Sequence, residues 1–442
     1  MIDIFYLPGR VCSTAAIREI AQQASAAYTM ICLKPDIEWV YLGQERMVQV
    51  MEMTNAPMVY ADHFAKIGDS VTQAPVIDYQ IGALRDDFDF GAVLLWNAKK
   101  LKELVAQMDT DYQFAGLYDL RLRAQSIVHI PEFLYYEVEN DTRKSGEKLF
   151  DYVDPRNRQV QVEMEACVTA HLKRIGAYLQ PGVYKPLPEA GDYPVTASVI
   201  IPCKNRARTI ADAIQSALNQ KVRDGYSFNV IVVDDNSTDG TIDKISDFKS
   251  QISNGQLIYI AQDKTWHAIG GNWNVAIHDP RCGKYAIQLD SDDTYFDETT
   301  VQKFIDAFES AGFGMVIGTY QLTNMAGETL PPGVIDHREW TDDNGRNNAL
   351  RINGLGAPRG FYVPLLRTIN YPTTKYGEDY AVGLRISRDW PIGRIYDVLY
   401  NCRRWEDNSD ANCDVIAMNR NNWYKDRLRS FELLARMNDC KS

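Results

Sequence analysis

Residues 228–245, FNVIVVDDNSTDGTIDKI, contain the transition that decides the fold: an apolar strand, a polar turn and a helix. The apolar run at 230–233 is typical of a strand that is buried on both faces. The turn is rich in Asp, Asn, Ser and Gly, and Thr238 or Asp239 is suited to cap the helix that follows. The stretch therefore predicts one βα unit.

The same succession recurs on both sides of this stretch. Upstream, an apolar run at 197–201 precedes apolar residues at helical spacing over 210–218, and downstream 257–261 and 285–289 are two further apolar runs. Strands that alternate with helices indicate βαβ units and a mostly parallel sheet with flanking helices. We therefore predict an α/β, Rossmann-like fold, in which ligands bind at the carboxyl ends of the strands.

Composition narrows the class of protein. The chain has 442 residues, a net charge of −12 and a hydrophobic content of 45%, which indicates two or three soluble domains and argues against broad nucleic-acid binding. No apolar stretch approaches the roughly 18 residues of a membrane span, and MIDIFYLPGR lacks the features of a signal peptide. The eight cysteines form no CxxC pair, so we expect reduced thiols, no zinc site and a cytoplasmic protein.

Acidic residues follow several of the predicted strands. In GKYAIQLDSDDTYF (283–296), Asp290, Asp292 and Asp293 come where a buried strand should end, and they predict either a solvated turn or a divalent-cation site. Asp235 is placed to accept hydrogen bonds from a base or ribose. In KYGEDYAVGLR, the Glu378–Asp379 pair precedes a helix, where a carboxylate can act as a general base. Each pattern alone also fits an ordinary polar loop, and the order and spacing of all of them carry the hypothesis.

Four motifs occur in order within residues 196–410: VIIPCKN, VIVVDDNSTDGT, YAIQLDSDD and GED. Together they resemble the family 2 glycosyltransferases, whose fold is the nucleotide-diphospho-sugar transferase (GT-A) fold. The resemblance implies an inverting transfer that depends on Mn²⁺ or Mg²⁺, with a UDP-sugar as the favoured donor and a GDP-sugar as the other candidate. It also implies a hydroxyl acceptor on a glycan, glycoconjugate or lipid-linked saccharide, usually in surface-polysaccharide assembly.

The resemblance also implies roles for single residues. By position, Pro202, Asn205 and Asn274 would line the nucleotide pocket, Asp235 would contact the nucleobase and Asp290 would lie near the ribose. Asp292 would bind the metal, and Asp379 would be the catalytic base, with Glu378 beside it. Arg206 and Arg208 either assist a phosphate or lie at an exposed helix start. Candidates for the donor or acceptor sugar are Asp293, Trp340, Arg359, Arg404 and Trp405, for which packing or an ordinary loop is the alternative.

Three departures from the family pattern stand out. Trp273 replaces an arginine that often precedes the asparagine at 274, and Lys264 is a candidate substitute. No histidine follows Asp379 to complete the metal shell, and Glu406 or Asp407 are candidates for that place. NCRRW resembles a motif of processive synthases, but the chain lacks their membrane helices, so processive synthesis is not expected.

The first half of the chain echoes the second. We match NAPMVYADHF (55–64) with GKYAIQLDSDD, 81–101 with 352–369, and 115–141 with 376–408. This predicts a degenerate GT-A-like domain at 1–145, a helix and Pro/Gly-rich linker at 146–195, a catalytic domain at 196–410 and a C-terminal helix at 411–442; two unrelated α/β domains are the alternative. Asp62 then matches Asp290 and Asp119 matches Asp379, but the other acids and the nucleotide loop are missing, so we expect no catalysis there.

Two further functions compete with a glycosyltransferase. A sugar nucleotidylyltransferase needs a glycine-rich basic loop after the first strand, and CKNRARTI has no glycine. A non-catalytic sugar- or nucleotide-binding scaffold suits the first half but not the second, where the acids are intact. For the transferase we expect a nucleotide-sugar donor, a saccharide acceptor, no nucleic acid, a homodimer as one option, and a location in the cytoplasm or on the inner membrane face.

Overall fold

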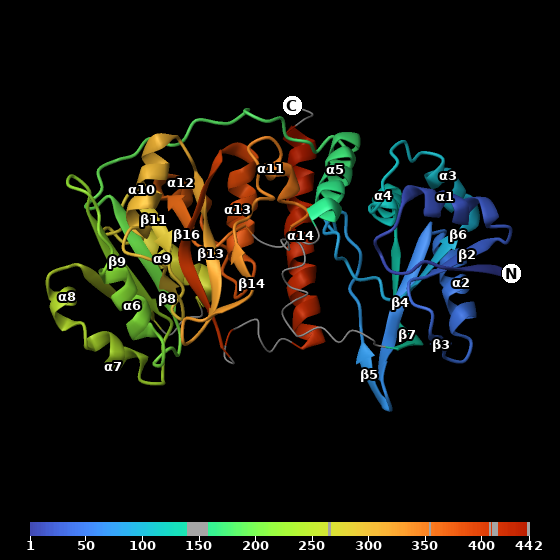
Figure 1. The fold of residues 1–442 in the computed structure, drawn as a ribbon, viewed down its shortest axis with the longest axis horizontal. Helices are drawn as coiled ribbons and strands as arrows, with labels where there is room; N and C mark the ends of the chain where they lie inside the picture. Colours follow the sequence, from blue (N-terminus) through green and yellow to red (C-terminus); the bar gives the residue numbers. More distant parts are fainter. Residues whose placement is uncertain (139–157, 264–266, 353–354, 406–407, 409–413, 440–442) are drawn as a thin grey trace. The chain divides into compact units, whose positions relative to one another are not determined.

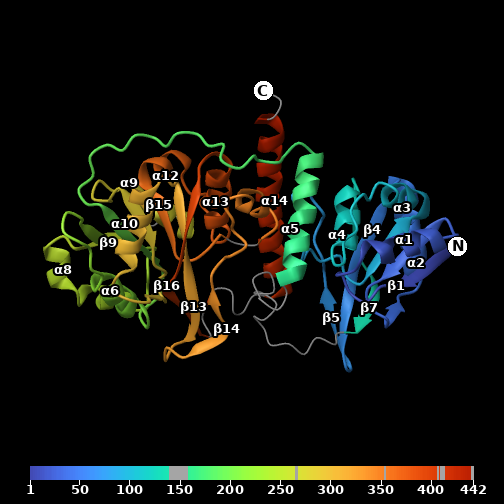
Figure 2. The same cartoon turned by 45° about the horizontal axis from the view of Figure 1, so that its top comes forward.

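The computed structural model divides the chain into two compact units (Figures 1 and 2). Unit 1 consists of residues 1–178, 350–352 and 413–442, and unit 2 consists of residues 179–349 and 353–412. The C-terminal helix therefore belongs to unit 1, although it follows unit 2 in the chain. The residues that the structure describes are 1–138, 158–263, 267–352, 355–405, 408 and 414–439.

Unit 2 is built on a nine-stranded mixed sheet of order β10-β9-β8-β11-β15-β13-β16-β12, with β14 paired to β13. Its strands are β8 (Ala197–Cys203), β9 (Phe228–Asp234), β10 (Leu257–Ala261), β11 (Tyr285–Gln288), β12 (Thr294–Tyr295), β13 (Met315–Asn324), β14 (Thr329–Ile335), β15 (Arg359–Tyr362) and β16 (Ile392–Arg404). The four predicted strands are β8 to β11, and they run parallel as neighbours. The predicted α/β fold is thus confirmed.

The helices of unit 2 connect these strands. They are α6 (Ile210–Leu218), α7 (Thr241–Ser246), α8 (Lys249–Ser253), α9 (Ala268–His278), α10 (Thr300–Ser310), α11 (Gly345–Asn348), α12 (Val363–Ile369) and α13 (Glu378–Asp389). Every residue of β8 is buried, as is nearly all of β9, which explains why both strands are apolar throughout. The polar loops at 204–209, 235–240 and 289–293 follow the carboxyl ends of β8, β9 and β11, so one edge of the sheet gathers them.

Unit 1 has a seven-stranded sheet of order β1-β2-β6-β4-β7-β3, with β5 paired to β4. Its elements are β1 (Ile2–Tyr6), α1 (Thr14–Gln23), β2 (Tyr28–Cys32), β3 (Ile37–Trp39), α2 (Gly43–Thr54), β4 (Met58–Ile67), β5 (Ser70–Ala74), β6 (Val93–Asn97), α3 (Ala98–Val105), α4 (Gly116–Arg123), β7 (Val128–Val138), α5 (Arg158–Arg174) and α14 (Val415–Asp439). One core cluster includes residues of α1, α3 and α4, and a second includes Met47 and Met51 of α2. Helices therefore cover both faces of this sheet.

The two sheets repeat one pairing pattern. β1 to β7 occupy the places of β8, β11, β12, β13, β14, β15 and β16, in that order, with the same neighbours and the same directions. In the described part of unit 1, no strand takes the place of β9 or β10. The correspondence confirms the prediction of two related domains.

The strand registers correct one detail of the predicted repeat. Tyr28 of β2 pairs with Asn97, and Tyr285 of β11 pairs with Tyr362; Asn97 and Tyr362 each precede the helix that follows their strand. The counterpart of the Asp-rich strand β11 is therefore β2, and NAPMVYADHF forms β4, the counterpart of β13. Matching Asp62 to Asp290 was wrong, and the residue at that place is Leu33.

The polar residues singled out in the first half have structural partners. Asp62 accepts a hydrogen bond from the backbone N–H of Val76 at 2.8 Å and contacts His129 Nε2 at 2.9 Å. Asp119 lies in the first turn of α4 and pairs with Arg123 at 2.9 Å. His63, which follows Asp62 in the chain, stacks on Tyr135. These contacts favour packing and local charge pairing over catalysis.

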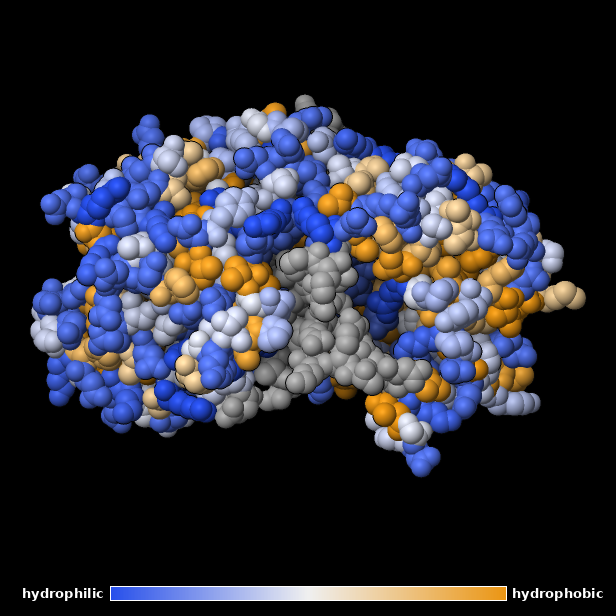
Figure 3. Space-filling view, in the orientation of Figure 1, coloured by the Kyte–Doolittle hydropathy of each residue, from blue (hydrophilic) through white to orange (hydrophobic). Residues whose placement is uncertain are grey.

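Figure 3 shows that hydrophilic residues cover most of one face, with hydrophobic residues in small groups. This surface agrees with the charge of −12. Within the described ranges, no helix is long and apolar enough to cross a bilayer.

Candidate active site

The loops after β8 and β9 are tied to each other by side chains. Asn205, with a φ of +53°, donates its backbone N–H to Ser237 Oγ at 2.8 Å, and its Oδ1 accepts the N–H of Thr238 at 2.8 Å. Arg206 N donates to Thr241 Oγ1 at 2.7 Å. Asparagine tolerates this left-handed backbone conformation better than most residues. Asn205 therefore fixes the shape of the predicted nucleotide loop, while Pro202 is buried in β8.

The two adjacent aspartates at the end of β9 have different surroundings. Asp234 accepts bonds from the backbone N–H and the hydroxyl of Ser237 and is buried in the turn. Asp235 instead points to Lys204, with 3.2 Å between Oδ2 and Nζ, and the Lys204 side chain is 55% exposed. Asp234 thus stabilises the turn, whereas Asp235 and Lys204 form a polar pair at the predicted nucleotide site.

The three acids after β11 are crowded and largely out of water. Asp293 is buried and accepts the N–H of Arg403 at 2.7 Å, while Asp290 accepts from Gln288 Nε2 at 3.0 Å. Burial, together with the charge of Asp292, raises the pKa of Asp290 and raises that of Asp293 well above its usual range. Such crowding favours a cation beside these carboxylates over a merely solvated turn.

Asp292 lies under an aromatic and basic cover. Trp405 donates its Nε1–H to Asp292 Oδ2 at 3.3 Å, and Arg206 Nε lies 3.8 Å from the same oxygen. The guanidinium of Arg208 stacks over the Trp405 ring at 5.1 Å from its centroid. Arg206, Arg208 and Trp405 are therefore brought to the metal candidate, and Arg404 is the last residue of β16.

A hydrogen-bonded chain links the candidate base to the acids after β11. Arg359, the first residue of β15, contacts Asp379 Oδ2 at 2.5 Å and donates to Gln288 Oε1 at 2.9 Å. The amide of Gln288 then donates to both carboxylate oxygens of Asp290 at 3.0 Å. Two carboxylates that are 89 positions apart in sequence are held in one constellation by a guanidinium and an amide.

The Glu378–Asp379 pair opens helix α13, as the sequence predicts. Gly377 precedes it with a φ of +76°, and the carboxylates lie in the first helical turn, where the helix dipole favours negative charge. Glu378 is buried, and burial together with the charge of Asp379 raises its pKa to about 8. At neutral pH, Glu378 is therefore mostly a neutral acid beside the more exposed Asp379.

Two predicted contacts have other roles. The side chain of Asn274 bonds the backbone N–H and the carbonyl of Tyr371 at 2.8 and 2.9 Å, so it holds the loop before α13 instead of facing the nucleotide loops. Trp340 is buried at 5% exposure, and its ring lies against Gly345. It is a core residue and is not placed to stack on a sugar. Lys264, Glu406 and Asp407 lie outside the described residues.

Residues 198–364 match the sequence profile of the family described as Glycosyl transferase family 2. This segment is a family 2 glycosyltransferase domain. The match begins in β8 and ends in α12, so it includes the nucleotide loops, the acids after β11 and Arg359. It confirms the family that the four motifs indicate.

Solved structures with some likeness to the chain are also glycosyltransferases. S. aureus TarS 1–349 in complex with UDP-GlcNAc has a TM-score of 0.41 and 19% identity, over 55% of this chain and 72% of that one. The mannosyltransferase PcManGT from Pyrobaculum calidifontis, in complex with GDP-Man and Mn²⁺, has a TM-score of 0.37 and 14% identity, over 65% and 86%. The match to the longer TarS structure spans 37% of that chain. No curated protein matches the chain.

The carboxylates of the glycosyltransferase domain suit a Mg²⁺- or Mn²⁺-type ion. Such ions take one or two carboxylates and complete their shell with water and substrate phosphates. Asp290 and Asp292 provide this pair, and their mutual repulsion is what a cation relieves. Among the described residues, no group of three or more His, Cys, Asp or Glu side chains is arranged to hold a metal. Asp290 and Asp292 therefore suit a metal site whose coordination shell is completed by the phosphates of the donor.

Sequence reasoning missed three residues of this site: Gln288, Arg403 and Lys204. The sequence does single out Gln288, because it is the one amide in the apolar run YAIQL. Arg403 is buried and bonds the carbonyl of Asp292 and the carboxylate of Asp212, which no local pattern indicates.

Proposed function

We propose that unit 2 transfers a sugar from a nucleotide-diphosphate donor to an acceptor hydroxyl, with inversion at the sugar carbon. The observation that carries the proposal is the chain of contacts from Asp379 through Arg359 and Gln288 to Asp290, with Asp292 two positions further along. All of these residues except Asp379 lie in the segment 198–364 that matches the glycosyltransferase family. A UDP-sugar is the favoured donor and a GDP-sugar the second. TarS and PcManGT, which carry UDP-GlcNAc and GDP-Man in their structures, support either a uridine or a guanosine nucleotide in the donor.

Each residue has a distinct task in this reaction. Asp235 and Lys204 bind the nucleoside part, and the backbone of the loop at 204–209 lies along it. Asp292, with Asp290 beside it, would hold Mn²⁺ or Mg²⁺, which when bound neutralises the diphosphate leaving group. Asp379 accepts the proton of the acceptor hydroxyl as that oxygen attacks the sugar carbon. Arg359 holds the Asp379 carboxylate in place, and the neutral Glu378 adds no second negative charge beside it.

The acceptor that we propose is a hydroxyl of a glycan, a glycoconjugate or a lipid-linked saccharide, in surface-polysaccharide assembly on the cytoplasmic side. Family resemblance supports this setting. Transfer assays with soluble oligosaccharides and with lipid-linked saccharides would separate the two kinds of acceptor, because only the class that is used gains label from a radiolabelled donor.

Calorimetry with UDP and GDP, with and without Mn²⁺, tests the proposal. We expect one nucleotide to bind more tightly with Mn²⁺, and Asp292→Asn to remove that gain. We expect Asp379→Asn to bind the nucleotide normally but to lose transfer. If neither nucleotide binds in the presence of Mn²⁺ or Mg²⁺, the transferase proposal fails; if Asp379→Asn transfers normally, its assignment as base fails.

A further inference from the structure

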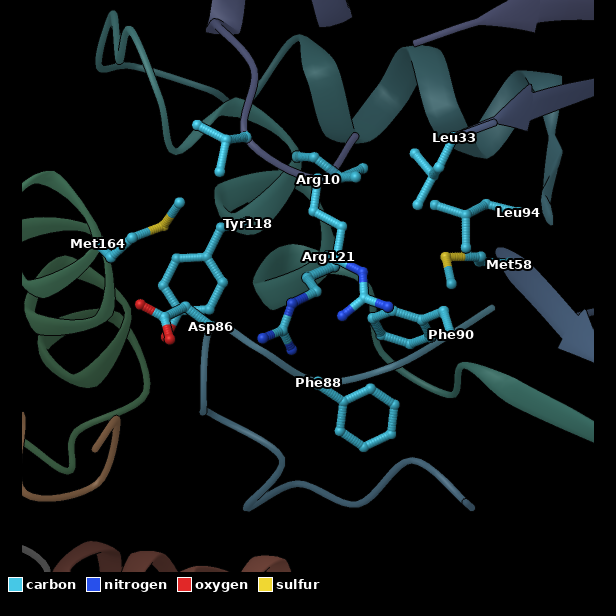
Figure 4. Close-up of a pocket in the computed structure, with 12 residues that line it drawn as sticks. Arg10, Leu33, Met58, Asp86, Phe88, Phe90, Leu94, Tyr118, Arg121 and Met164 are labelled. Carbon is cyan, nitrogen blue, oxygen red and sulfur yellow. The ribbon is translucent and has the colours of Figure 1, made fainter. Parts of the chain in front are cut away.

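Unit 1 contains a pocket of its own, whose empty space of about 460 Å³ includes open solvent at its mouth (Figure 4). The loop after β1, the segment before β6 and helix α4 contribute most of its lining. The lining residues are Arg10, Val11, Leu33, Met58, Asp86, Phe88, Phe90, Leu94, Leu117, Tyr118, Arg121 and Met164. The pocket thus lies within a single unit and is mostly apolar.

This pocket occupies the place that the active site has in unit 2. By the strand registers, Leu33 follows β2 as Asp290 follows β11, and Leu94 of β6 corresponds to Arg359 of β15. Leu117 is the second residue of α4, as Asp379 is of α13. Three charged positions of the active site are therefore leucines here.

The remaining polar side chains of the pocket are occupied by protein partners. Tyr118 donates its hydroxyl to the carbonyl of Leu84, and Arg121 Nη1 donates to the carbonyl of Ala83 at 2.8 Å. The Arg121 guanidinium also stacks on the ring of Tyr118, 4.7 Å from its centroid.

The two polar residues at the rim are engaged in the same way. Asp86 accepts from Arg351 at 2.6 Å, and Arg10 pairs with Asp89 and donates to the carbonyl of Asp87 at 3.2 Å. A molecule in the pocket therefore meets mainly methyl groups, methylenes and ring faces.

We propose that this pocket binds a small, neutral ring compound, aromatic or alicyclic. A mostly apolar lining favours apolar molecules, because binding removes the nonpolar surface of both partners from water. Phe88, Phe90 and Tyr118 provide ring faces for such a compound. A sugar or nucleotide is disfavoured, because its hydroxyls or phosphates would lose water without gaining partners from Leu33, Leu94 or Leu117.

The test uses N-phenyl-1-naphthylamine, a neutral aromatic probe whose fluorescence rises in apolar sites, with the full-length chain. We expect saturable binding to one site. Val11→Trp places an indole at the rim and is expected to weaken binding by about tenfold or more, roughly 1.4 kcal/mol. Val71→Trp on β5 is the matched control, because both valines are 47% exposed and Val71 does not line the pocket. Circular dichroism would show that both variants fold.

A second measurement needs no variant. Benzophenone, a neutral photo-crosslinker, is expected to label the segments 86–90 and 117–121 in competition with the probe. Binding of the probe by Val11→Trp as tight as by the control, or labelling confined to other segments, would overturn the proposal. So would displacement of the probe by UDP or N-acetylglucosamine from the Asp292→Asn protein, whose metal site in unit 2 is impaired.

Discussion

Units 1 and 2 share seven strands with the same partners and directions, yet the same corner of the sheet is apolar in one and charged in the other. In unit 2, Asp290 and Asp379 are joined by a chain of polar groups, while in unit 1 Leu33 and Leu117 line a mostly apolar pocket. Strand pairing and the buried core thus maintain the fold, and a few residues at the strand ends maintain the chemistry. In unit 1 the leucines at these places, Leu33, Leu94 and Leu117, belong to the hydrophobic core.

The difference extends to electrostatics. In unit 2, burial and, secondarily, the charge of Asp292 raise the pKa of Asp290 and of Asp293. The buried charges of unit 1 are instead paired: Asp426 of α14 contacts Arg85 at 3.3 Å and Arg429 at 2.8 Å. The crowded acids of unit 2 are suited to bind a ligand, whereas the paired charges of unit 1 stabilise its fold.

The largest effect is expected when the residue of unit 1 is placed in unit 2. Asp379→Leu copies Leu117 and removes the proposed general base, so the transfer rate should fall by about a hundred- to ten-thousandfold. Nucleotide affinity should stay within about twofold, because Asp379 does not contact the loops after β8 and β9. Steady-state kinetics and calorimetry on the same samples would check both expectations. If Asp379→Leu retained transfer, the charged residue at this place in unit 2 would not be what distinguishes it functionally from unit 1.

Next in size is a loss of stability in unit 1. Asp426→Ala leaves Arg85 and Arg429 without their shared carboxylate and should lower the free energy of unfolding by about 3–5 kcal/mol. Asp292→Ala in unit 2 is the control, because removing a repelled acid should lower stability little or not at all. Urea unfolding of the two variants would measure the difference. Equal losses would contradict the division between structural and functional charges.

A smaller effect is expected at Gln288. Gln288→Leu breaks the link from Arg359 to Asp290, so kcat should fall by about ten- to a hundredfold through misplacement of the charged groups. Gln302→Leu in α10 is a matched control, because Gln302 is also a buried glutamine of unit 2 but bonds Arg223 and Asp306 away from the site. If both variants lose the same activity, Gln288 has no positioning role.

The smallest effect concerns pH and unit 1. Burial lowers the pKa of His129, but its bonds to Asp62 and Asp78 outweigh burial and raise the pKa above 6.5. The stabilisation is therefore complete below the unfolded value of about 6.5 and is lost as pH rises through the folded value. Hydrogen exchange of peptides from β4 and β7 should quicken over that range beyond the intrinsic pH effect, and His129→Gln should remove the excess. An unchanged profile in that variant would rule out His129 as the source.

Much of the catalytic half could be predicted because its signals are local. The apolar runs of β8 to β11 and the acids that follow them are contiguous in sequence. The repeat was harder, because β2 and β4 are both apolar strands, and only β4 runs into an aspartate as β11 does. Their partners in the sheet decide the match, and pairing over long sequence separations has no local pattern. The bonds from Arg359 to Gln288 and Asp379 could not be predicted from the sequence for the same reason.

Helix α14 has a consequence for how the chain is made. Unit 1 combines residues that precede unit 2 in the chain with residues that follow it, since α14 covers Gly82 and Arg85. During synthesis, domains generally fold in the order in which they leave the ribosome. Unit 2 can complete its sheet first, while unit 1 waits, with Arg85 and its apolar surroundings uncovered, for the 25 residues of α14. Unit 1, whose first residues precede unit 2 in the chain, is thus finished after unit 2.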